Sequence, residues 1–495
     1  MSFAKIYTRG LLGLHAPSIE VEVHISQGLP SLTIVGLPEA AVRESKDRVR
    51  SAIINSGFQF PTKRLTINLA PADLPKDGSR LDLPIALGIL IASGQLPENS
   101  TNGFEFIGEL ALDGQLRPIT GTLSIAIACQ QANHKLILPA QNAQEASQLP
   151  LFEVFSAEHL KQVCNHLNNT QPLKAFENKQ SFQINKSKYD LSDVKGQLRP
   201  RRALEIAAAG GHSLLFKGPP GTGKTLLASR LSSILPPLTT QENLEVASIY
   251  SVANAAHYFG QRPFRTPHHT ASAVALVGGG SHPKPGEITL SHLGVLFLDE
   301  LPEFDRKVLE VLRQPLEAKE IVISRASRQI TFPANFQLIA AMNPCPCGYA
   351  FNQDVRCQCS ADAIKRYQNR ISGPLLDRID LHIDVPPLQA SELQDTKPVE
   401  DSETVRLRVI AAYNFQIERQ NCLNMALSPK QLEKYATLDI QASKIIELAQ
   451  KRLNLSARAY HRVLRVARTI ADLALSENIQ STHLTEALSY RNQHA

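Results

Sequence analysis

The stretch that decides the fold runs from Ser213 to Thr225 and reads Ser-Leu-Leu-Phe-Lys-Gly-Pro-Pro-Gly-Thr-Gly-Lys-Thr. Residues 213–217 predict a short apolar strand, and residues 226–235 predict a helix. A glycine-rich loop between a strand and a helix is the setting in which backbone N–H groups bind nucleotide phosphates. A plain tight turn is the alternative, but the flanking strand and helix favour nucleotide binding. The expected nucleotide ligands are Gly218, Pro219, Pro220, Gly221, Thr222, Gly223, Lys224 and Thr225.

Four residues around this loop have distinct chemical tasks. Lys224 would neutralise phosphate charge, and the hydroxyl of Thr225 would ligate Mg²⁺. Downstream, the apolar residues 295–298 predict a buried parallel strand that ends in Asp299 and Glu300. We expect Asp299 to hold the magnesium ion and Glu300 to polarise the attacking water, as phosphoryl transfer requires. The start of a helix is the alternative interpretation of these two acids.

Two further polar residues follow the expected strands. A strand is predicted at residues 336–341, and it leads to Asn343, whose amide could orient the same water. Arg378 lies after the nucleotide core, where an arginine that reaches the γ-phosphate of a neighbouring subunit is expected. An internal salt bridge with Asp377 or Asp380 is the alternative role for Arg378.

A predicted amphipathic helix near the end of the chain carries three arginines on one face. Arg458, Arg462 and Arg465 follow the spacing i, i+4, i+7, and apolar residues occupy the opposite face. Arg458 is the candidate for a lid arginine that closes over ATP. A solvated basic face is the alternative, above all for Arg462 and Arg465.

The length of 495 residues exceeds what one hydrophobic core organises and suggests about three domains. We expect an α+β domain at residues 1–168, a linker at 169–188, an α/β ATPase domain with a parallel sheet at 189–388 and a helical lid domain at 389–495. The net charge of +6 is mild for this length, so it permits nucleic acid without indicating it. Because no stretch is typical of a signal peptide or a membrane span, we expect a cytoplasmic protein.

Four of the seven cysteines fall between residues 345 and 359. Cys345, Cys347, Cys357 and Cys359 form two C-x-C pairs, which can hold Zn²⁺ in a tetrahedral four-thiolate site. Because C-x-C is less common than C-x₂-C at such sites, four free thiols are the alternative. Four thiolates leave no position for water, so we expect the metal to brace its loop and to leave ATP binding largely unaffected.

Seven stretches of the chain carry a resemblance to a known family: residues 71–78, 218–225, 264–269, 294–300, 343–348, 373–380 and 468–472. Together they resemble the ComM/YifB family of magnesium-chelatase-like AAA+ proteins, over essentially the whole chain. The resemblance implies a hexameric, ATP- and Mg²⁺-dependent motor that binds DNA, translocates on it and promotes branch migration during natural transformation. It also matches Asn343 to a sensor position, Arg378 to an arginine finger and Arg458 to a second sensor.

Two segments are candidate DNA contacts, one before the Asp299 strand and one in a hairpin expected at residues 320–332. The first resembles the insertion that related motors direct at DNA, although its histidines could equally form hydrogen bonds within the loop. The tip of the second would face the pore of a ring and contact phosphates, with ordinary surface arginines as the alternative. The candidates are Arg265, His268 and His269 in the first segment and Arg325 and Arg328 in the second.

The first domain resembles the proteolytic domain of Lon proteases, notably at residues 75–78 and 116–139. The catalytic residues do not carry over. Arg80 occupies the position of the Lon serine, and Ser79 lies one residue too early. Residues 121–125 contain no lysine that could activate a hydroxyl. We therefore expect a Lon-like domain without protease activity, used for assembly or for handling DNA.

Three functions are compatible with such an ATPase core. The first is DNA translocation, as the resemblance implies. The second is the motor subunit of a magnesium-inserting porphyrin enzyme, in which the additional first domain and the cysteines are not expected. The third is an ATP-dependent protease, which the missing catalytic pair disfavours. Stimulation of ATP hydrolysis by forked DNA, by porphyrin or by casein would discriminate among them.

Overall fold

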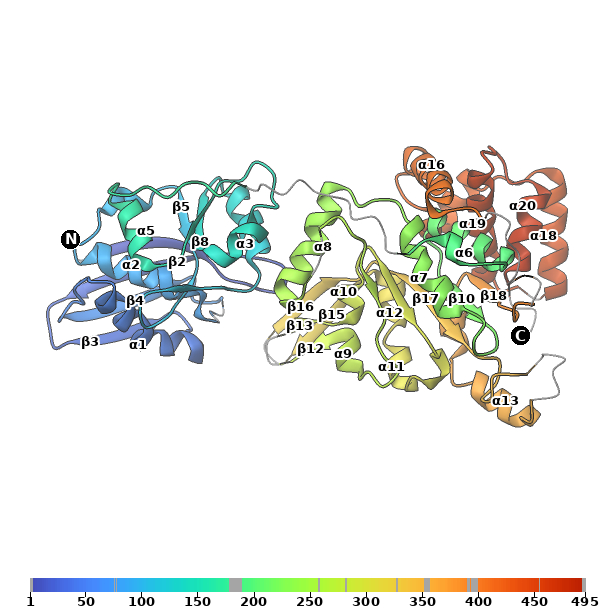
Figure 1. The fold of residues 1–495 in the computed structure, drawn as a ribbon, viewed down its shortest axis with the longest axis horizontal. Coiled ribbons are helices and arrows are strands. Elements are labelled where there is room, and N and C mark those ends of the chain that lie inside the picture. Colours follow the sequence, from blue (N-terminus) through green and yellow to red (C-terminus); the bar gives the residue numbers. More distant parts are fainter. Residues whose placement is uncertain are drawn as a thin grey trace. The chain divides into compact units, whose positions relative to one another are not determined.

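The computed structural model describes residues 3–74, 76, 78–177, 189–256, 259–280, 283–325, 328–350, 357–389, 392, 399–453 and 455–491 (Figure 1). The chain divides into two compact units. The first comprises residues 1–183 and 240–259, and the second comprises residues 184–239 and 260–495. A helix from the segment expected to form the ATPase domain therefore belongs to the N-terminal unit.

A mixed sheet and two helices form the first half of the first unit: β1 (Phe3–Arg9), β2 (Ser18–Ser26), β3 (Ser31–Val35), β4 (Arg64–Ala70), α1 (Ala40–Asn55) and α2 (Asp82–Ala92). The strand order is β1-β2-β4-β3, and only β3 and β4 are parallel. Alternate residues of β2 from Ile19 to Ile25 are buried, as the period-two pattern predicts. Helix α2 is buried on all sides and packs against β1, β2 and α1.

A smaller parallel sheet, a two-stranded ladder and four helices complete the first unit: β5 (Phe104–Phe106), β6 (Glu109–Leu110), β7 (Leu116–Arg117), β8 (Lys135–Pro139), β9 (Val154–Ala157), α3 (Thr122–Gln131), α4 (Ala143–Ala146), α5 (Leu160–Leu167) and α8 (Thr240–Ala253). Helix α8 packs against α3. Its Leu244 and Ala247 join the apolar cluster built on α3 and β8. The backbone N–H of Gly121 donates to the carbonyl oxygen of Ser251 at 3.2 Å.

A parallel sheet organises the second unit: β10 (Leu214–Lys217), β11 (Phe264–Arg265), β14 (Val295–Leu298), β17 (Gln337–Met342) and β18 (Leu381–Asp384). The strand order is β11-β14-β17-β10-β18, and all neighbours are parallel. The glycine-rich loop, Asp299 and Asn343 therefore follow three adjacent strands. Because the carboxyl ends of parallel strands meet at one edge, the structure confirms that these groups share the edge where ligands bind.

Eight helices and two hairpins accompany this sheet in the described part of the chain: α6 (Leu198–Gly210), α7 (Lys224–Ile234), α9 (Ala273–Val277), α10 (Glu287–Leu290), α11 (Arg306–Glu310), α12 (Arg313–Ala318), α13 (Ala361–Gln368), α14 (Gly373–Leu376), β12 (Gly278–Gly279) with β13 (Lys284–Pro285), and β15 (Glu320–Arg325) with β16 (Arg328–Pro333). The bounds of the second hairpin agree with the hairpin predicted at residues 320–332 to within one residue. Its Ile321, Ile323 and Ile330 are buried, so one face of the hairpin packs on the unit.

The end of the chain is helical, as expected: α16 (Ser402–Gln420), α17 (Pro429–Tyr435), α18 (Ile440–Leu453), α19 (Ala457–Leu473) and α20 (Ser481–Ser489). These helices do not form a separate hydrophobic core. Val463, Val466 and Ile470 of α19 belong to the same buried cluster as Phe216 of β10 and Ile339 of β17. The helical end and the parallel sheet thus stabilise each other.

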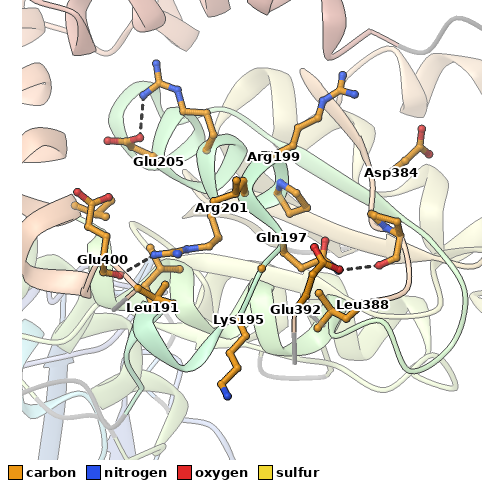
Figure 2. Close-up of a pocket in the computed structure, with 17 residues that line it drawn as sticks. Leu191, Lys195, Gln197, Arg199, Arg201, Glu205, Asp384, Leu388, Glu392 and Glu400 are labelled. Carbon is orange, nitrogen blue, oxygen red and sulfur yellow. Dashed lines mark hydrogen bonds and ion pairs between the residues drawn. The ribbon is translucent and has the colours of Figure 1, made fainter. Parts of the chain in front are cut away.

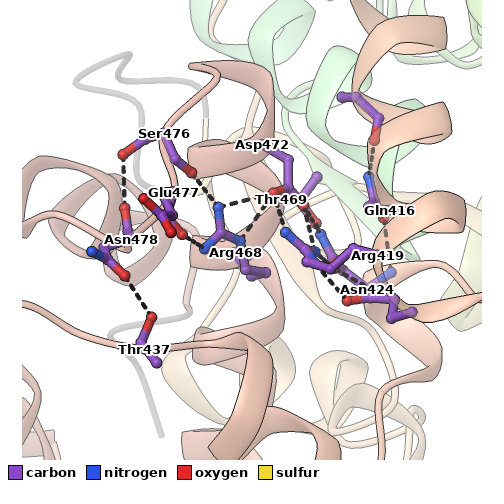
Figure 3. A network of polar contacts seen from close by, with 12 residues as sticks. Gln416, Arg419, Asn424, Thr437, Arg468, Thr469, Asp472, Ser476, Glu477 and Asn478 are labelled. Carbon is purple, nitrogen blue, oxygen red and sulfur yellow. Dashed lines mark hydrogen bonds and ion pairs between the residues drawn. The ribbon is translucent and has the colours of Figure 1, made fainter.

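A buried polar network also fixes α19 (Figure 3). Both oxygens of Asp472 accept hydrogen bonds from Arg419, at 2.7 and 3.0 Å. Arg468 is fully buried and donates from Nε to Asp472 at 3.0 Å. Thr469 extends the network to His212, just before β10, at 2.8 Å. Because loss of one partner would leave a buried charge unpaired, this network strongly favours a single position of α19.

Candidate functional site: a nucleotide site with adjoining arginines and cysteines

The glycine-rich loop connects β10 to the N-terminus of α7. Gly223, directly before α7, has a φ of 85°, in the left-handed region that favours glycine. At Gly218, a Cβ atom would overlap the carbonyl oxygen of Val385. Glycine is required at one position by the backbone conformation and at the other by close packing. The loop therefore presents backbone N–H groups at the start of a helix, which is a favourable place for phosphate.

The ammonium group of Lys224 lies at the centre of the loop. Its Nζ donates to the carbonyl oxygens of Gly218 at 2.8 Å and Pro219 at 2.7 Å, and to the side-chain oxygen of Asn343 at 3.1 Å. Burial lowers the pKa of Lys224, and nearby carboxylates oppose this shift. A partly desolvated ammonium group surrounded by neutral oxygens favours an anionic ligand, so the site fits a polyphosphate.

Thr225 and Asp299 meet beside this lysine. Oγ1 of Thr225 donates to Oδ2 of Asp299 at 2.6 Å, although the residues are 74 positions apart. One comes from the first turn of α7 and the other from the end of β14. A hydroxyl next to a carboxylate is an oxygen donor set that suits Mg²⁺. These two residues therefore fit the ion that accompanies ATP.

Glu300 follows Asp299 in an unusual backbone conformation. Its φ of 51° lies in the left-handed region, which non-glycine residues adopt rarely and which is concentrated at functional sites. The carboxylate is half exposed, and its Oε2 lies 3.2 Å from Nδ1 of His269. The structure thus places a histidine predicted to contact DNA against the acid predicted to polarise water.

Arg378 and Arg458 share a single carboxylate. Their Nη2 atoms lie 2.6 and 3.1 Å from Oε1 of Glu317 in α12. The side chain of Arg378 is only 8% exposed, whereas that of Arg458 is 54% exposed. Arg378 thus forms its salt bridge with Glu317, and not with Asp377 or Asp380, the partners predicted as the alternative. Sequence reasoning missed Glu317, because no local motif marks it.

The predicted solvated basic face of α19 is wrong for two of its three arginines. Arg462 is buried beside Asp380, with 3.7 Å between Nε and Oδ1, and burial lowers the pKa of Arg462 to about 10. Arg465 donates two hydrogen bonds to the carbonyl oxygen of Leu427. Tertiary packing covers this side of the helix, which the spacing alone could not show. Among the three, only Arg458 is exposed.

The four cysteines of the predicted metal site come together. The sulfur atoms of Cys345, Cys347, Cys357 and Cys359 all lie within 4.8 Å of one another. Cys345 is buried and the other three are at least partly exposed. A hydrogen bond from the backbone of Tyr349 lowers the pKa of the Cys347 thiol to about 6, which favours the thiolate. Four sulfur ligands in mutual contact form a donor set that fits Zn²⁺.

The candidate DNA contacts have different surroundings. Arg265 forms a bidentate ion pair with Glu287 of α10, with both distances 2.7 Å, so its charge is compensated within the chain. His268 forms a hydrogen bond of 2.9 Å with a neighbouring threonine hydroxyl. Arg325 and Arg328 are paired through their backbones at the turn of the β15–β16 hairpin. The side chains of these last two arginines lie outside the described part of the chain.

Comparison with known proteins identifies the family. Three family profiles match: "Magnesium chelatase, subunit ChlI" at residues 190–393, "Subunit ChlI of Mg-chelatase" at residues 21–142 and "Magnesium chelatase, subunit ChlI C-terminal" at residues 399–491. The competence protein ComM of Haemophilus influenzae is 51% identical, across 99% of this chain and 98% of that protein. The uncharacterized protein YifB of Salmonella typhimurium is 50% identical, across 99% of this chain and 97% of that protein. The chain belongs to the ComM/YifB family.

Membership of this magnesium-chelatase-like AAA+ family implies ATPase activity, in agreement with the geometry around Lys224 and Asp299. The expected mixed α/β architecture, with a parallel sheet and a helical end, is also confirmed. In the described part of the chain, no helix is long and apolar enough to cross a membrane.

The comparison also finds a more distant relative of this ComM/YifB protein. Lon protease 2 of Bacillus subtilis is 26% identical over 165 residues, which cover 30% of this chain and 29% of that protein. Ser79 donates a hydrogen bond to the carboxylate of Glu109, and Lys76 donates to the carbonyl oxygen of Pro71. Ser79 and Lys76 thus have separate hydrogen-bond partners.

A cavity of about 960 Å³ opens at the start of α6, and no residue of the glycine-rich loop lines it (Figure 2). Its arginines are bound within the chain. Arg201 donates to the backbone carbonyl of Glu400 at 2.7 Å, and Arg202 donates to Glu205 at 2.8 Å. Because these cations already have partners, we assign no anionic ligand to this cavity.

Proposed function

We propose that this protein is an ATP-driven DNA translocase that promotes branch migration of recombining strands during natural transformation. The observation that carries the motor part is the assembly of Lys224, Thr225, Asp299, Glu300 and Asn343 at one edge of a parallel sheet. The DNA part rests on the family, and above all on the competence protein at 51% identity. This function also places the protein in the cytoplasm.

Each side chain at the sheet edge has a proposed task. Lys224 and the loop backbone bind the phosphates of ATP, and Thr225 and Asp299 hold Mg²⁺. Bound there, the ion supplies charge neutralisation during phosphoryl transfer. Glu300 polarises the attacking water, and Asn343 orients it. The hydrogen bond between Asn343 and Lys224 supports a sensor role for Asn343, because it joins this amide to the phosphate-binding group.

We propose a homo-oligomeric ring, hexameric by analogy with the family. In this ring Arg378 reaches the nucleotide of a neighbouring subunit, and Arg458 closes over ATP. Arg325 and Arg328, at the hairpin turn, would face the pore and contact DNA phosphates. Arg265 is a weaker candidate for this role, because Glu287 already compensates its charge.

We also propose that the four cysteines hold a structural zinc ion. The mutual distances of their sulfur atoms support this assignment. Purified protein should then contain about one zinc ion per chain. Protein prepared without chelators and found free of metal would contradict this proposal without affecting the ATPase assignment.

The proposed function predicts which ligand stimulates ATP hydrolysis. We expect forked DNA to raise the rate and to be unwound or migrated, while porphyrin and casein leave the rate unchanged. Lys224→Ala, which removes the phosphate-binding ammonium group, serves as the inactive control. Stimulation by a porphyrin, with none by DNA, would show instead that the protein is a motor for metal insertion.

A further inference from the structure

The four-cysteine cluster directly adjoins the nucleotide site along the chain. Asn343 directly follows β17 and accepts a hydrogen bond from Lys224, and Cys345 lies two residues further on. Cys345 is buried, and its Sγ accepts a hydrogen bond from the backbone of Ala350 at 3.2 Å. Only one residue, Pro344, separates Cys345 from Asn343. A displacement of the Cys345 sulfur atom should therefore also displace the side-chain amide of Asn343.

The cysteine segment also packs directly on the phosphate-binding loop. Gly348 has a φ of 90°, and a Cβ atom built there would lie 2.5 Å from Cδ and 3.1 Å from Cγ of Pro220. The backbone of the cysteine segment thus lies in van der Waals contact with the loop that binds phosphates. Glycine is required here by both its conformation and the lack of space.

Helix α13, which begins two residues after Cys359, holds the same segment from a second direction. Gln368 donates from Nε2 to the carbonyl oxygen of Pro344 at 3.0 Å. Tyr367 of the same helix is buried, which raises its pKa to about 12. Both cysteine pairs are therefore attached to Pro344, the residue that follows Asn343, one through the chain and the other through α13.

We propose that the four-cysteine centre is a working part of the nucleotide site: metal bound there sets the positions of Pro220 and Asn343 and thereby controls the affinity for nucleotide. This inference rests on the proposed zinc site. Without the metal no bond joins the four sulfur atoms, so the two pairs can separate and the support behind both residues is removed. It differs from the expectation that the metal leaves ATP binding largely unaffected, and the experiment below decides between the two.

The test compares nucleotide affinity in the full-length protein with and without zinc. Zinc content is measured by mass spectrometry, and the dissociation constant of a fluorescent ADP is measured before chelation, after it and after reloading with Zn²⁺. We expect the affinity for ADP to fall by about tenfold when zinc is removed and to recover when zinc is restored. Loss of the residues that position metal ligands has effects of similar size at other metal sites. An unchanged dissociation constant in zinc-free protein would overturn the inference.

Variants separate this coupling from general damage to the fold. Cys359→Ser should lose both zinc and ADP affinity, whereas Cys422→Ser, at a half-buried cysteine outside the cluster, should keep both. Gly348→Ala should keep zinc but bind ADP more weakly, because its methyl group displaces Pro220. If Gly348→Ala binds ADP normally, the proposed contact is wrong.

If Cys359→Ser does not fold, reversible chelation of the unaltered protein still tests the coupling between zinc and ADP affinity. Stimulation by forked DNA is measured separately, so failure of the coupling does not touch the proposed motor function.

Discussion

Glu317 illustrates how one residue can restrain two others. It binds both Arg378, the proposed arginine finger, and Arg458, the arginine proposed to close over ATP. A carboxylate oxygen and a phosphate oxygen make similar charge-assisted hydrogen bonds with a guanidinium group. Under the proposed roles of the two arginines, we expect Glu317 to compete with nucleotide for both and to hold them until ATP binds.

Replacement of Glu317 should release these arginines. We expect Glu317→Gln to raise basal ATP hydrolysis, or affinity for ATP, by up to about fivefold, the equivalent of the ~1 kcal/mol that an exposed ion pair contributes. Steady-state kinetics with the charge-matched control Glu310→Gln, which pairs with Arg313 instead, would measure the effect. A rate reduced to the level of Arg378→Ala would show that Glu317 positions the finger rather than competing for it.

Glu300 is expected to govern turnover but not binding. In Glu300→Gln, magnesium ligation by Asp299 is retained, while the water loses its polarising carboxylate. The rate should fall by at least about a hundredfold, as loss of a general base does, with nucleotide affinity preserved. Glu303→Gln is a suitable control, because Glu303 pairs with Arg370 at the protein surface. Near-normal turnover would mean that another residue polarises the water.

Local spacing explains which site residues could be predicted. The loop from Gly218 to Thr225 is one continuous motif, and Asp299 and Asn343 each follow an apolar strand, so periodicity was sufficient to find them. Glu317 and Arg458 are 141 residues apart, and no local pattern predicts their contact. The contact of His269 with Glu300 is likewise tertiary, since a loop brings the histidine to the end of another strand.

At the scale of elements, α8 departs most clearly from the expected organisation. It follows α7 after only residues 235–239, yet it packs on α3 in the N-terminal unit. Its sequence reads as an ordinary helix with buried apolar residues, and nothing in that pattern shows which surface it packs against. The predicted domain boundaries follow chain order, so they could not include a helix that crosses from one unit to the other.

Leu244→Ala tests whether this contact holds α8 in place. Truncation of a buried leucine costs about 2–5 kcal/mol, so α8 should separate from α3 more often. We expect faster hydrogen exchange at the amide of Gly121, which donates to Ser251 of α8. Gln241→Ala, at an exposed position of the same helix, should leave exchange unchanged. Equal protection in the two variants would show that the Gly121 amide does not report on α8.

At the scale of the assembly, Arg378 predicts how subunits depend on one another. Because an arginine finger acts on the nucleotide of a neighbour, mixing Arg378→Ala with unaltered subunits should reduce activity more steeply than dilution. Arg370→Ala, at an exposed ion pair with Glu303, should follow simple dilution. Strict proportionality for Arg378→Ala would assign this arginine to its own subunit, where Glu317 holds it.

The DNA contact proposed at the turn of the β15–β16 hairpin can be tested by its dependence on salt. One face of the hairpin is buried through Ile321, Ile323 and Ile330, so the turn at Arg325 and Arg328 is carried by a packed ladder. A translocase must hold any sequence, and its contacts should therefore be electrostatic and release counterions. Removing both arginines should weaken binding to DNA regardless of its sequence and lower the salt slope by about one unit per lost phosphate contact.

The double variant Arg325→Ala/Arg328→Ala should therefore keep its basal ATP hydrolysis, because the groups at the sheet edge are unchanged, but DNA should no longer stimulate it. The double variant Arg306→Ala/Lys307→Ala removes the same charge from the exposed start of α11 and controls for the net charge of the chain. Binding titrations at several salt concentrations distinguish the two. If both variants retain the affinity, the salt slope and the branch migration of the unaltered protein, then the pore contact lies on another element, and the hairpin arginines are ordinary surface residues.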